Sequence, residues 1–180
     1  NCTRTCNLHC LHCYADSDSK IYSGELTTDE AKTMIRDLVS FGVPALLFSG
    51  GEPLIRKDLF ELLAYTRAFG LRTTLSTNGT LITKAIAANL KAVGVQYVGI
   101  SLDGLGPIND HFRGRVGAYH AAVQGIRRCL AVHQKVGLRM TLTRHNVDDL
   151  PRILDFIEEE NIPRVCFYHL VGSGRGQGLV

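Results

Sequence analysis

Short apolar, β-branched runs alternate along the chain with longer stretches in which apolar residues recur at helical spacing. The runs predict strands at 44–48, 72–76, 97–101, 137–143 and 164–171. The amphipathic stretches predict helices within 27–42, 56–70, 83–94, 117–137 and 146–163. The strand starts lie roughly 25 to 40 residues apart, which is the length of one strand and one crossover helix. This alternation predicts an α/β fold built on a parallel sheet.

Each predicted strand ends in polar or Gly-rich sequence: "SGGEP", "STNG", "SLDG", "TRHN" and "HLVGSGRG". A doubly wound sheet is one alternative, but polar residues at every carboxyl end favour one shared active face, as in (β/α) barrels. Counting one more strand before the cysteines, we expect a partial (β/α)6 TIM-like barrel that occupies residues 1–180 as a single core domain. That first strand would lie mostly before Asn1, so we expect a fragment of a longer protein with its first strand truncated.

Composition narrows the class of protein. Apolar residues make up 45% of the 180 positions and charged residues 21%, which is typical of a globular domain. No run is long and apolar enough for a membrane span, and no secretory signal is visible, so we expect a cytoplasmic protein without a membrane partner. The net charge of +3 comes from scattered basic residues, which gives no support for a nucleic-acid partner.

Four of the six cysteines, Cys2, Cys6, Cys10 and Cys13, fall near the start of the chain. Clustered cysteines in a reducing compartment are more often metal ligands than disulfides. Structural zinc sites usually join two separated cysteine pairs, and no second pair follows here. Three thiolates spaced C-x3-C-x2-C would instead hold three irons of a cubane cluster and leave the fourth iron open.

Other candidate ligands lie close to these thiolates. Cys2 either supplies a fourth thiolate that closes the site or is a small buried side chain at a strand end, and the second interpretation is favoured. His9 and His12 are possible ligands, although histidines in such a loop are more often surface groups. The two remaining cysteines, Cys129 and Cys166, fall in helical and strand patterns and are expected to be core thiols.

The stretch "CNLHCLHCY", followed in order by "SGGEP", "STNG" and "SLDG", resembles the radical S-adenosylmethionine (SAM) enzymes over essentially the whole chain. The resemblance implies a [4Fe–4S] cluster on Cys6, Cys10 and Cys13. It also implies that the amine and carboxylate of SAM chelate the open iron. An electron from the cluster would then cleave SAM, and the resulting 5′-deoxyadenosyl radical would remove a hydrogen atom from the substrate.

The resemblance places the methionyl amine of SAM at "SGGEP". Gly50 and Gly51 would let the backbone approach the ligand closely, and Glu52 would accept hydrogen bonds from the ammonium group. The alternative is a plain strand-to-helix turn that ends at Pro53.

The next two strand ends would contact the ribose or carboxylate of SAM. Ser76 and Asn78 belong to "STNG", although Asn-Gly is also a common turn signal. Ser101 and Asp103 belong to "SLDG" and would contact the sugar hydroxyls, unless Asp103 only caps a turn.

Further SAM contacts are implied along the chain. Arg113 resembles an arginine that pairs with the SAM carboxylate, and its two-pronged donor geometry suits that group. His12 takes a position that is often aromatic in the family and associated with the adenine, and Tyr14 follows it in the same loop. Met140 and Leu170 would be apolar walls for the adenine or ordinary core residues.

The resemblance is closest to the branch that modifies tetrapyrroles in haem d1 and alternative haem synthesis, on the stretches "CYADSDSKIYSGELTTDEA" and "CFYHLVGSGRG". It implies loss of a propionate side chain, an electron donor such as flavodoxin or ferredoxin, and a second cluster in a C-terminal extension outside this chain. Carboxylates of such a substrate would suit basic residues near the strand ends: Arg56, Arg113, Arg115, Arg144, His145 and Arg175. Two alternatives remain, namely a peptide maturase and a non-catalytic four-cysteine metal-binding module.

Overall fold

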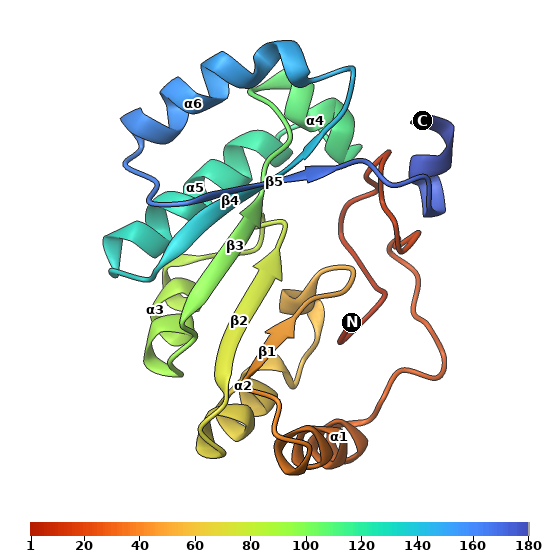
Figure 1. Ribbon diagram of the computed structural model, residues 1–180, viewed down its shortest axis with the longest axis vertical. Helices are drawn as coiled ribbons and strands as arrows, with labels where there is room; N and C mark the ends of the chain where they lie inside the picture. Colours follow the sequence, from red (N-terminus) through yellow and green to blue (C-terminus); the bar gives the residue numbers. More distant parts are fainter. Residues whose placement is uncertain (180) are drawn as a thin grey trace.

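Five parallel strands form one curled sheet in the order β1-β2-β3-β4-β5 (Figure 1). The computed structural model describes residues 1–179. The strands are β1 (Ala45–Phe48), β2 (Arg72–Thr77), β3 (Tyr97–Ser101), β4 (Val136–Leu142) and β5 (Val165–His169). All five lie within two residues of their predicted positions, and the expected partial barrel is confirmed.

The helices cover the outer side of the sheet, while the N-terminal loop lies at the edge where the strands end (Figure 1). The helices are α1 (Thr28–Ser40), α2 (Leu59–Ala68), α3 (Lys84–Ala92), α4 (Pro107–Arg113), α5 (Ala118–Ala131) and α6 (Leu150–Glu159). Three short 3-10 helices complete the described elements: η1 (Pro53–Ile55), η2 (Val147–Asp149) and η3 (Gly174–Leu179). The five predicted helices are all present. None of the helices in the described part of the chain is long and apolar enough to cross a membrane.

Helix α4 is the element that the sequence pattern missed. Pro107 stands at its start and the left-handed Gly114 ends it, so both boundary signals are present. Its seven residues are too few for a clear helical period, because they make about two turns.

The core lies between the outer face of the sheet and the helices. Alternate strand residues point outward and pack against apolar helix residues, as a period of two requires. Fully buried members of this core include Leu75, Val98, Ile100 and Leu138 from the strands and Leu62, Leu90 and Ile126 from the helices. The strand residues between these outward-pointing positions face the hollow of the curled sheet.

Residues 2–5 run parallel to the segment that follows β1. The amide of Cys2 donates to the carbonyl of Ser49 at 2.6 Å, and Gly51 and Glu52 donate to Thr3 and Thr5 at 2.8 and 2.9 Å. The chain that leads into the cysteine loop is therefore tied to the carboxyl end of β1. The sixth strand expected before Asn1 stays a prediction.

Candidate active site

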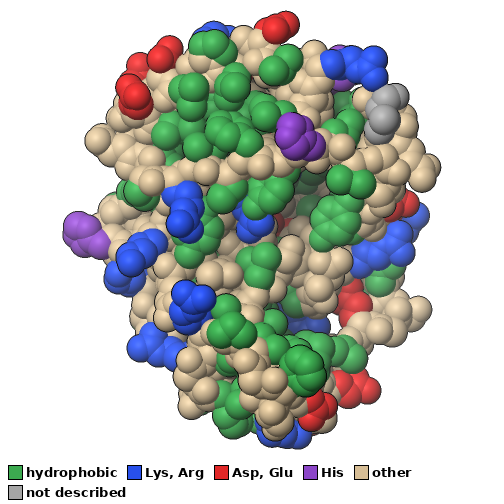
Figure 2. Space-filling model, in the orientation of Figure 1, with side chains coloured by type: hydrophobic (Ala, Val, Ile, Leu, Met, Phe, Trp, Pro, Cys, Tyr) green, Lys and Arg blue, Asp and Glu red, His purple; other side chains and the backbone are tan. Residues whose placement is uncertain are grey.

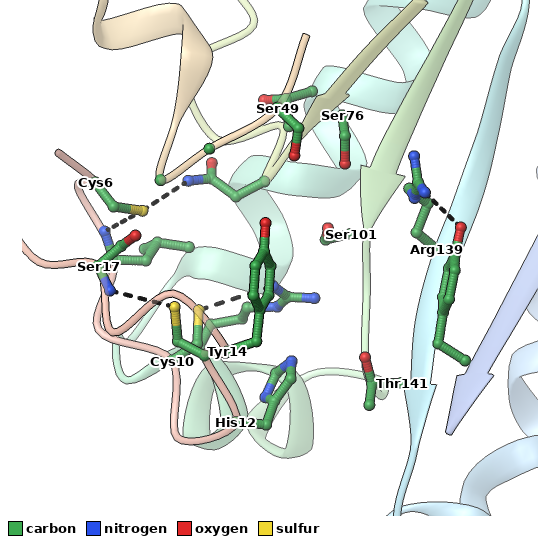
Figure 3. A pocket seen from close by; sticks show the side chains of 18 of the residues that line it. Cys6, Cys10, His12, Tyr14, Ser17, Ser49, Ser76, Ser101, Arg139 and Thr141 are labelled. Atoms are coloured by element: carbon green, nitrogen blue, oxygen red, sulfur yellow. Dashed lines mark hydrogen bonds between the residues drawn. The ribbon is translucent and has the colours of Figure 1, made fainter. Parts of the chain in front are cut away.

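A cavity of about 440 Å³ opens where the strands end and the N-terminal loop crosses them (Figure 3). Its lining includes Cys6, Cys10 and Cys13 from the loop and residues from all five strands or the segments that follow them. This agrees with the expectation of a shared face at the carboxyl ends of the strands. On the face shown in Figure 2, Lys and Arg side chains are interspersed with apolar and other residues.

The three cysteine sulfurs on the cavity wall each receive N–H donors. The amides of Leu8 and Ser17 lie 3.5 and 3.4 Å from the sulfurs of Cys6 and Cys13. Arg113 donates to Cys10 Sγ at 3.8 Å, and Asn78 lies 3.9 Å from Cys6 Sγ. Donors around sulfur stabilise thiolates and cluster-bound sulfurs, so the donor set fits an iron–sulfur cluster.

Burial changes the ionisation of two of these thiols. Burial raises the pKa of Cys6 to about 11, and burial likewise raises the pKa of Cys10 against the opposing effect of Arg113. Without a metal these two thiols would stay protonated at neutral pH. Binding to iron removes the proton and supplies the positive charge that the buried thiolates need.

Cys2 does not share this environment. It packs against the main core and lies outside the cavity lining. Within residues 1–179, no three Cys, His, Asp or Glu side chains are grouped in a way that would hold a single metal ion. Cys2 thus lies apart from the cavity that Cys6, Cys10 and Cys13 line, and which of the four cysteines bind a cluster stays a prediction.

The cysteine loop rests on α4 and on the C-terminal segment. The amides of His9 and Leu11 donate to the carbonyls of Arg113 and Phe112 at the end of α4. A Cβ at Gly114 would collide with the carbonyl of His9, so a glycine is required at this contact. Helix α4, which the sequence pattern missed, thus supports the loop that carries the cysteines.

Asp103 is fully buried behind the cavity wall, where it meets two basic side chains. Its Oδ2 lies 2.5 Å from Arg113 and 3.1 Å from His12, and its Oδ1 accepts from the amide of Thr141 at 2.8 Å. Burial alone would raise the pKa of Asp103, but Arg113 and His12 hold it below its usual value. Asp103 does not line the cavity and holds Arg113 and His12 in place, and its expected contact with the sugar stays a prediction.

Glu52 is fully buried and lies outside the cavity lining as well. Its carboxylate accepts from Thr77 Oγ1 and the amide of Asn78, both at 2.7 Å, and from the amide of Leu54 at 3.1 Å. Burial raises the pKa of Glu52, and these donors oppose that effect. The side chain ties the segment after β1 to the end of β2, and its expected contact with the SAM amine stays a prediction.

The two glycines before Glu52 do line the cavity, and they also have a packing role. A Cβ at Gly50 or Gly51 would collide with the backbone of Thr3 or Thr5, the segment that leads into the cysteine loop. These glycines are needed for a close approach of two backbones, and the proposed approach of a ligand is compatible with that packing.

The remaining residues predicted to contact SAM form two groups, those that line the cavity and one that does not. Those on the cavity wall are His12, Tyr14, Ser76, Asn78, Ser101, Arg113 and Leu170. Met140 is fully buried and lies outside the cavity lining, because period two on β4 points Arg139 and Thr141 into the cavity instead. The alternative interpretation of Met140 as a core residue is the one that fits the structure.

Several cavity residues were not predicted: Ser17, Leu47, Ser49, Arg139, Thr141 and Tyr168. For β4, the alternation of side chains was the signal that could have found Arg139 and Thr141. The hydroxyl of Ser17 is buried and has no hydrogen-bond partner among residues 1–179, so it is available to a ligand.

Most of the basic residues considered for substrate carboxylates are engaged or lie elsewhere. Arg56 binds Asp58 and two backbone carbonyls, and Arg175 binds Asp16 and the cysteine loop. Arg115, Arg144 and His145 are exposed and lie outside the cavity. Of the two distant cysteines, Cys129 is buried in the core as predicted, whereas Cys166 is only half-buried.

Comparison with known proteins identifies relatives along the whole chain. This protein chain is 55% identical over its full length to Fe-coproporphyrin III synthase of Methanosarcina barkeri and covers 45% of that protein. It is 46% identical over 98% of its length to pre-heme d1 synthase of Dinoroseobacter shibae, of which it covers 44%. The chain thus spans less than half the length of these curated relatives.

The fold and the family signature agree with these relatives. The solved structure of Streptococcus suis SuiB bound to S-adenosylmethionine superposes with a TM-score of 0.81 over 94% of this chain and 39% of SuiB, at 20% identity, which shows a shared fold. Residues 1–157 match the Radical SAM superfamily. Enzymes of that family use a [4Fe–4S] cluster and SAM, as expected from the cysteine loop. The chain belongs to the radical SAM superfamily.

Proposed function

We propose that this chain is the core of an enzyme that reductively cleaves SAM at a [4Fe–4S] cluster on Cys6, Cys10 and Cys13. The observation that carries the proposal is the position of these three sulfurs on one cavity wall, with N–H donors to each, while Cys2 lies outside that cavity and packs against the core. Three protein thiolates leave one iron of a cubane for SAM. When bound, the cluster supplies the electron that breaks a carbon–sulfur bond of SAM.

The chain's own residues position SAM and shield it from water. Ser76, Asn78 and Ser101 offer hydroxyl and amide groups to the ribose and carboxylate, and Leu170 offers an apolar wall to the adenine. Arg113 offers its guanidinium to the SAM carboxylate while Asp103 holds it in place. The cavity between the loop and the sheet excludes bulk water and stray hydrogen donors from the reacting groups.

The substrate we propose is a tetrapyrrole whose propionate side chains are modified. Support comes from the two relatives that are 55% and 46% identical to this chain, which are named as synthases of Fe-coproporphyrin III and pre-heme d1. As a part of the same proposal, the enzyme works in the cytoplasm and receives its electron from a flavodoxin or ferredoxin. Its first strand and a C-terminal extension with a second cluster would lie beyond residues 1–180.

Product analysis tests this proposal. The anaerobically reconstituted, dithionite-reduced enzyme should convert SAM to 5′-deoxyadenosine and methionine, as measured by chromatography. Cys10→Ala should abolish that conversion, whereas Cys129→Ala, which removes a core thiol far from the cavity, should retain it. Equal turnover by the wild type and Cys10→Ala would contradict the three-cysteine site.

A further inference from the structure

Three arginines line the cavity, and they differ in the partners that balance their charge. Arg113 is paired with Asp103, and Arg175 is paired with Asp16. Among residues 1–179, Arg139 has no carboxylate within ion-pair distance. Its guanidinium donates to the hydroxyl of Tyr168 at 2.5 Å and lies 5.1 Å from the centre of that ring. Arg139 therefore brings an uncompensated positive charge to the cavity wall.

The fold places this charge on the inner face of the barrel. Arg139 lies at the middle of β4, where its backbone pairs with Ser101 of β3 and Cys166 of β5. In Figure 3, Arg139 lies on the side of the cavity opposite Cys6 and Cys10, and its guanidinium is hydrogen-bonded to Tyr168 of the neighbouring strand β5. The charge thus faces the cavity from the wall opposite the cysteine loop.

Gly99 on β3 leaves the space in which the Arg139 side chain lies. A Cβ at Gly99 would lie 2.6 Å from Arg139 Cδ and 3.1 Å from Cγ, closer than side-chain atoms pack. The stem of Arg139 lies in the space that a larger residue would fill. Its guanidinium is therefore held between Gly99 and Tyr168, which lowers the entropy cost of binding a ligand.

A planar guanidinium with its charge unpaired suits a carboxylate, because two parallel N–H groups match the two oxygens. The carboxylate could come from SAM or from the substrate. The cysteines that would hold the cluster, and with it SAM, lie across the cavity from Arg139, which favours the substrate as the source. We propose that Arg139, held by Gly99 and Tyr168, binds a carboxylate of the substrate on the inner barrel wall. This inference rests on the proposed function.

Binding measurements distinguish a carboxylate of the substrate from the carboxylate of SAM. They use the holoenzyme with its oxidised cluster, because SAM stays intact in that state. Coproporphyrin III, which carries four propionates, is followed by its Soret absorbance, and SAM by equilibrium dialysis. Arg139→Gln should weaken coproporphyrin binding about tenfold or more, in line with a lost charge-assisted pair, and leave SAM binding within about twofold. Arg164→Gln, an exposed arginine outside the cavity, is the matched control and should change neither.

Two further comparisons sharpen the test. Gly99→Ala keeps the positive charge but displaces the Arg139 side chain, so it should also weaken coproporphyrin binding. The uncharged tetra-amide of coproporphyrin should bind the wild type and Arg139→Gln equally, because it offers no carboxylate.

The outcomes distinguish the inference from the function it rests on. Equal coproporphyrin affinity of the wild type and Arg139→Gln would overturn the inference alone. A loss of SAM affinity with unchanged coproporphyrin affinity would assign the carboxylate to SAM and overturn the inference as well. A wild type that binds SAM but no tetrapyrrole would contradict the proposed substrate class itself.

Discussion

Arg175 and Cys10 are 165 positions apart, yet Arg175 Nε donates a hydrogen bond to the carbonyl oxygen of Cys10 at 2.7 Å. The same guanidinium donates to Asp16 Oδ1 at 2.7 Å and to the carbonyl of Ser17 at 2.8 Å, and the amide of Arg175 donates to the carbonyl of Cys13. One side chain from the end of the described chain thus holds both sides of the cysteine loop.

Arg175→Gln should therefore make the cluster labile without unfolding the barrel. The loop loses three side-chain hydrogen bonds, whereas the core between sheet and helices is untouched. We expect iron loss to a chelator to be about tenfold faster, which corresponds to one or two net hydrogen bonds. The decay of the cluster's visible absorbance after chelator addition measures this rate. Arg144→Gln, an exposed arginine outside the cavity, is the control, and equal rates for the two variants would refute the role of Arg175.

Asp103→Asn should destabilise the fold strongly, because it removes the counter-charge of Arg113 in a buried site. Breaking a buried ion pair from one side costs about 3–5 kcal/mol. Urea unfolding gives the change in free energy, with the exposed Asp148→Asn as control. Adding Arg113→Met to Asp103→Asn should recover part of the loss. A cost for Asp103→Asn as small as that of the control would show that Arg113 does not depend on Asp103.

Gly51→Ala should separate the cysteine-bearing segment from the end of β1. The new methyl group would collide with the carbonyls of Arg4 and Thr5, and backbone cannot move aside as a flexible side chain can. We expect a loss of about 2 kcal/mol or more in unfolding free energy, together with reduced iron content after reconstitution. Gly178→Ala is the matched control, because a Cβ there meets open space. Full iron content in Gly51→Ala would contradict the packing role.

The buried thiol of Cys129 should make stability depend on pH in the alkaline range. Burial raises the pKa of its thiol from 9.0 to about 11, so between these values the unfolded chain loses its proton while the folded chain keeps it. Unfolding then releases a proton, and stability falls as pH rises through this window, by about 1–3 kcal/mol. Urea unfolding at pH 8 and pH 11 should show a smaller fall for Cys129→Ala than for the wild type. Parallel pH profiles would show that another group causes the alkaline loss.

The strands and five of the helices could be predicted because their apolar period is set by burial against a single core. The sulfur ligands could be proposed because their spacing is local. The pattern did not predict which side chains at the strand ends reach the cavity. Glu52 and Asp103 stand at such ends, yet both turn inward to buried donors, a choice that depends on contacts between elements far apart in sequence.

The contacts of the C-terminal segment with the cysteine loop could not be predicted from the sequence for the same reason. Arg175 lies in a Gly-rich stretch without a helical or strand period, and its partners are in the cysteine loop. Arg139 differs, since simple alternation along β4 would have pointed it into the barrel once the buried positions Leu138 and Met140 were identified.

Three protein thiolates would leave one iron of the cluster open to SAM. The most direct measurement is the EPR spectrum of the anaerobically reconstituted, dithionite-reduced protein with and without SAM, in the wild type and in Cys2→Ala. We predict a reduced [4Fe–4S] signal that changes when SAM is added, in both proteins alike. A signal indifferent to SAM, or a cluster lost in Cys2→Ala, would contradict the open site.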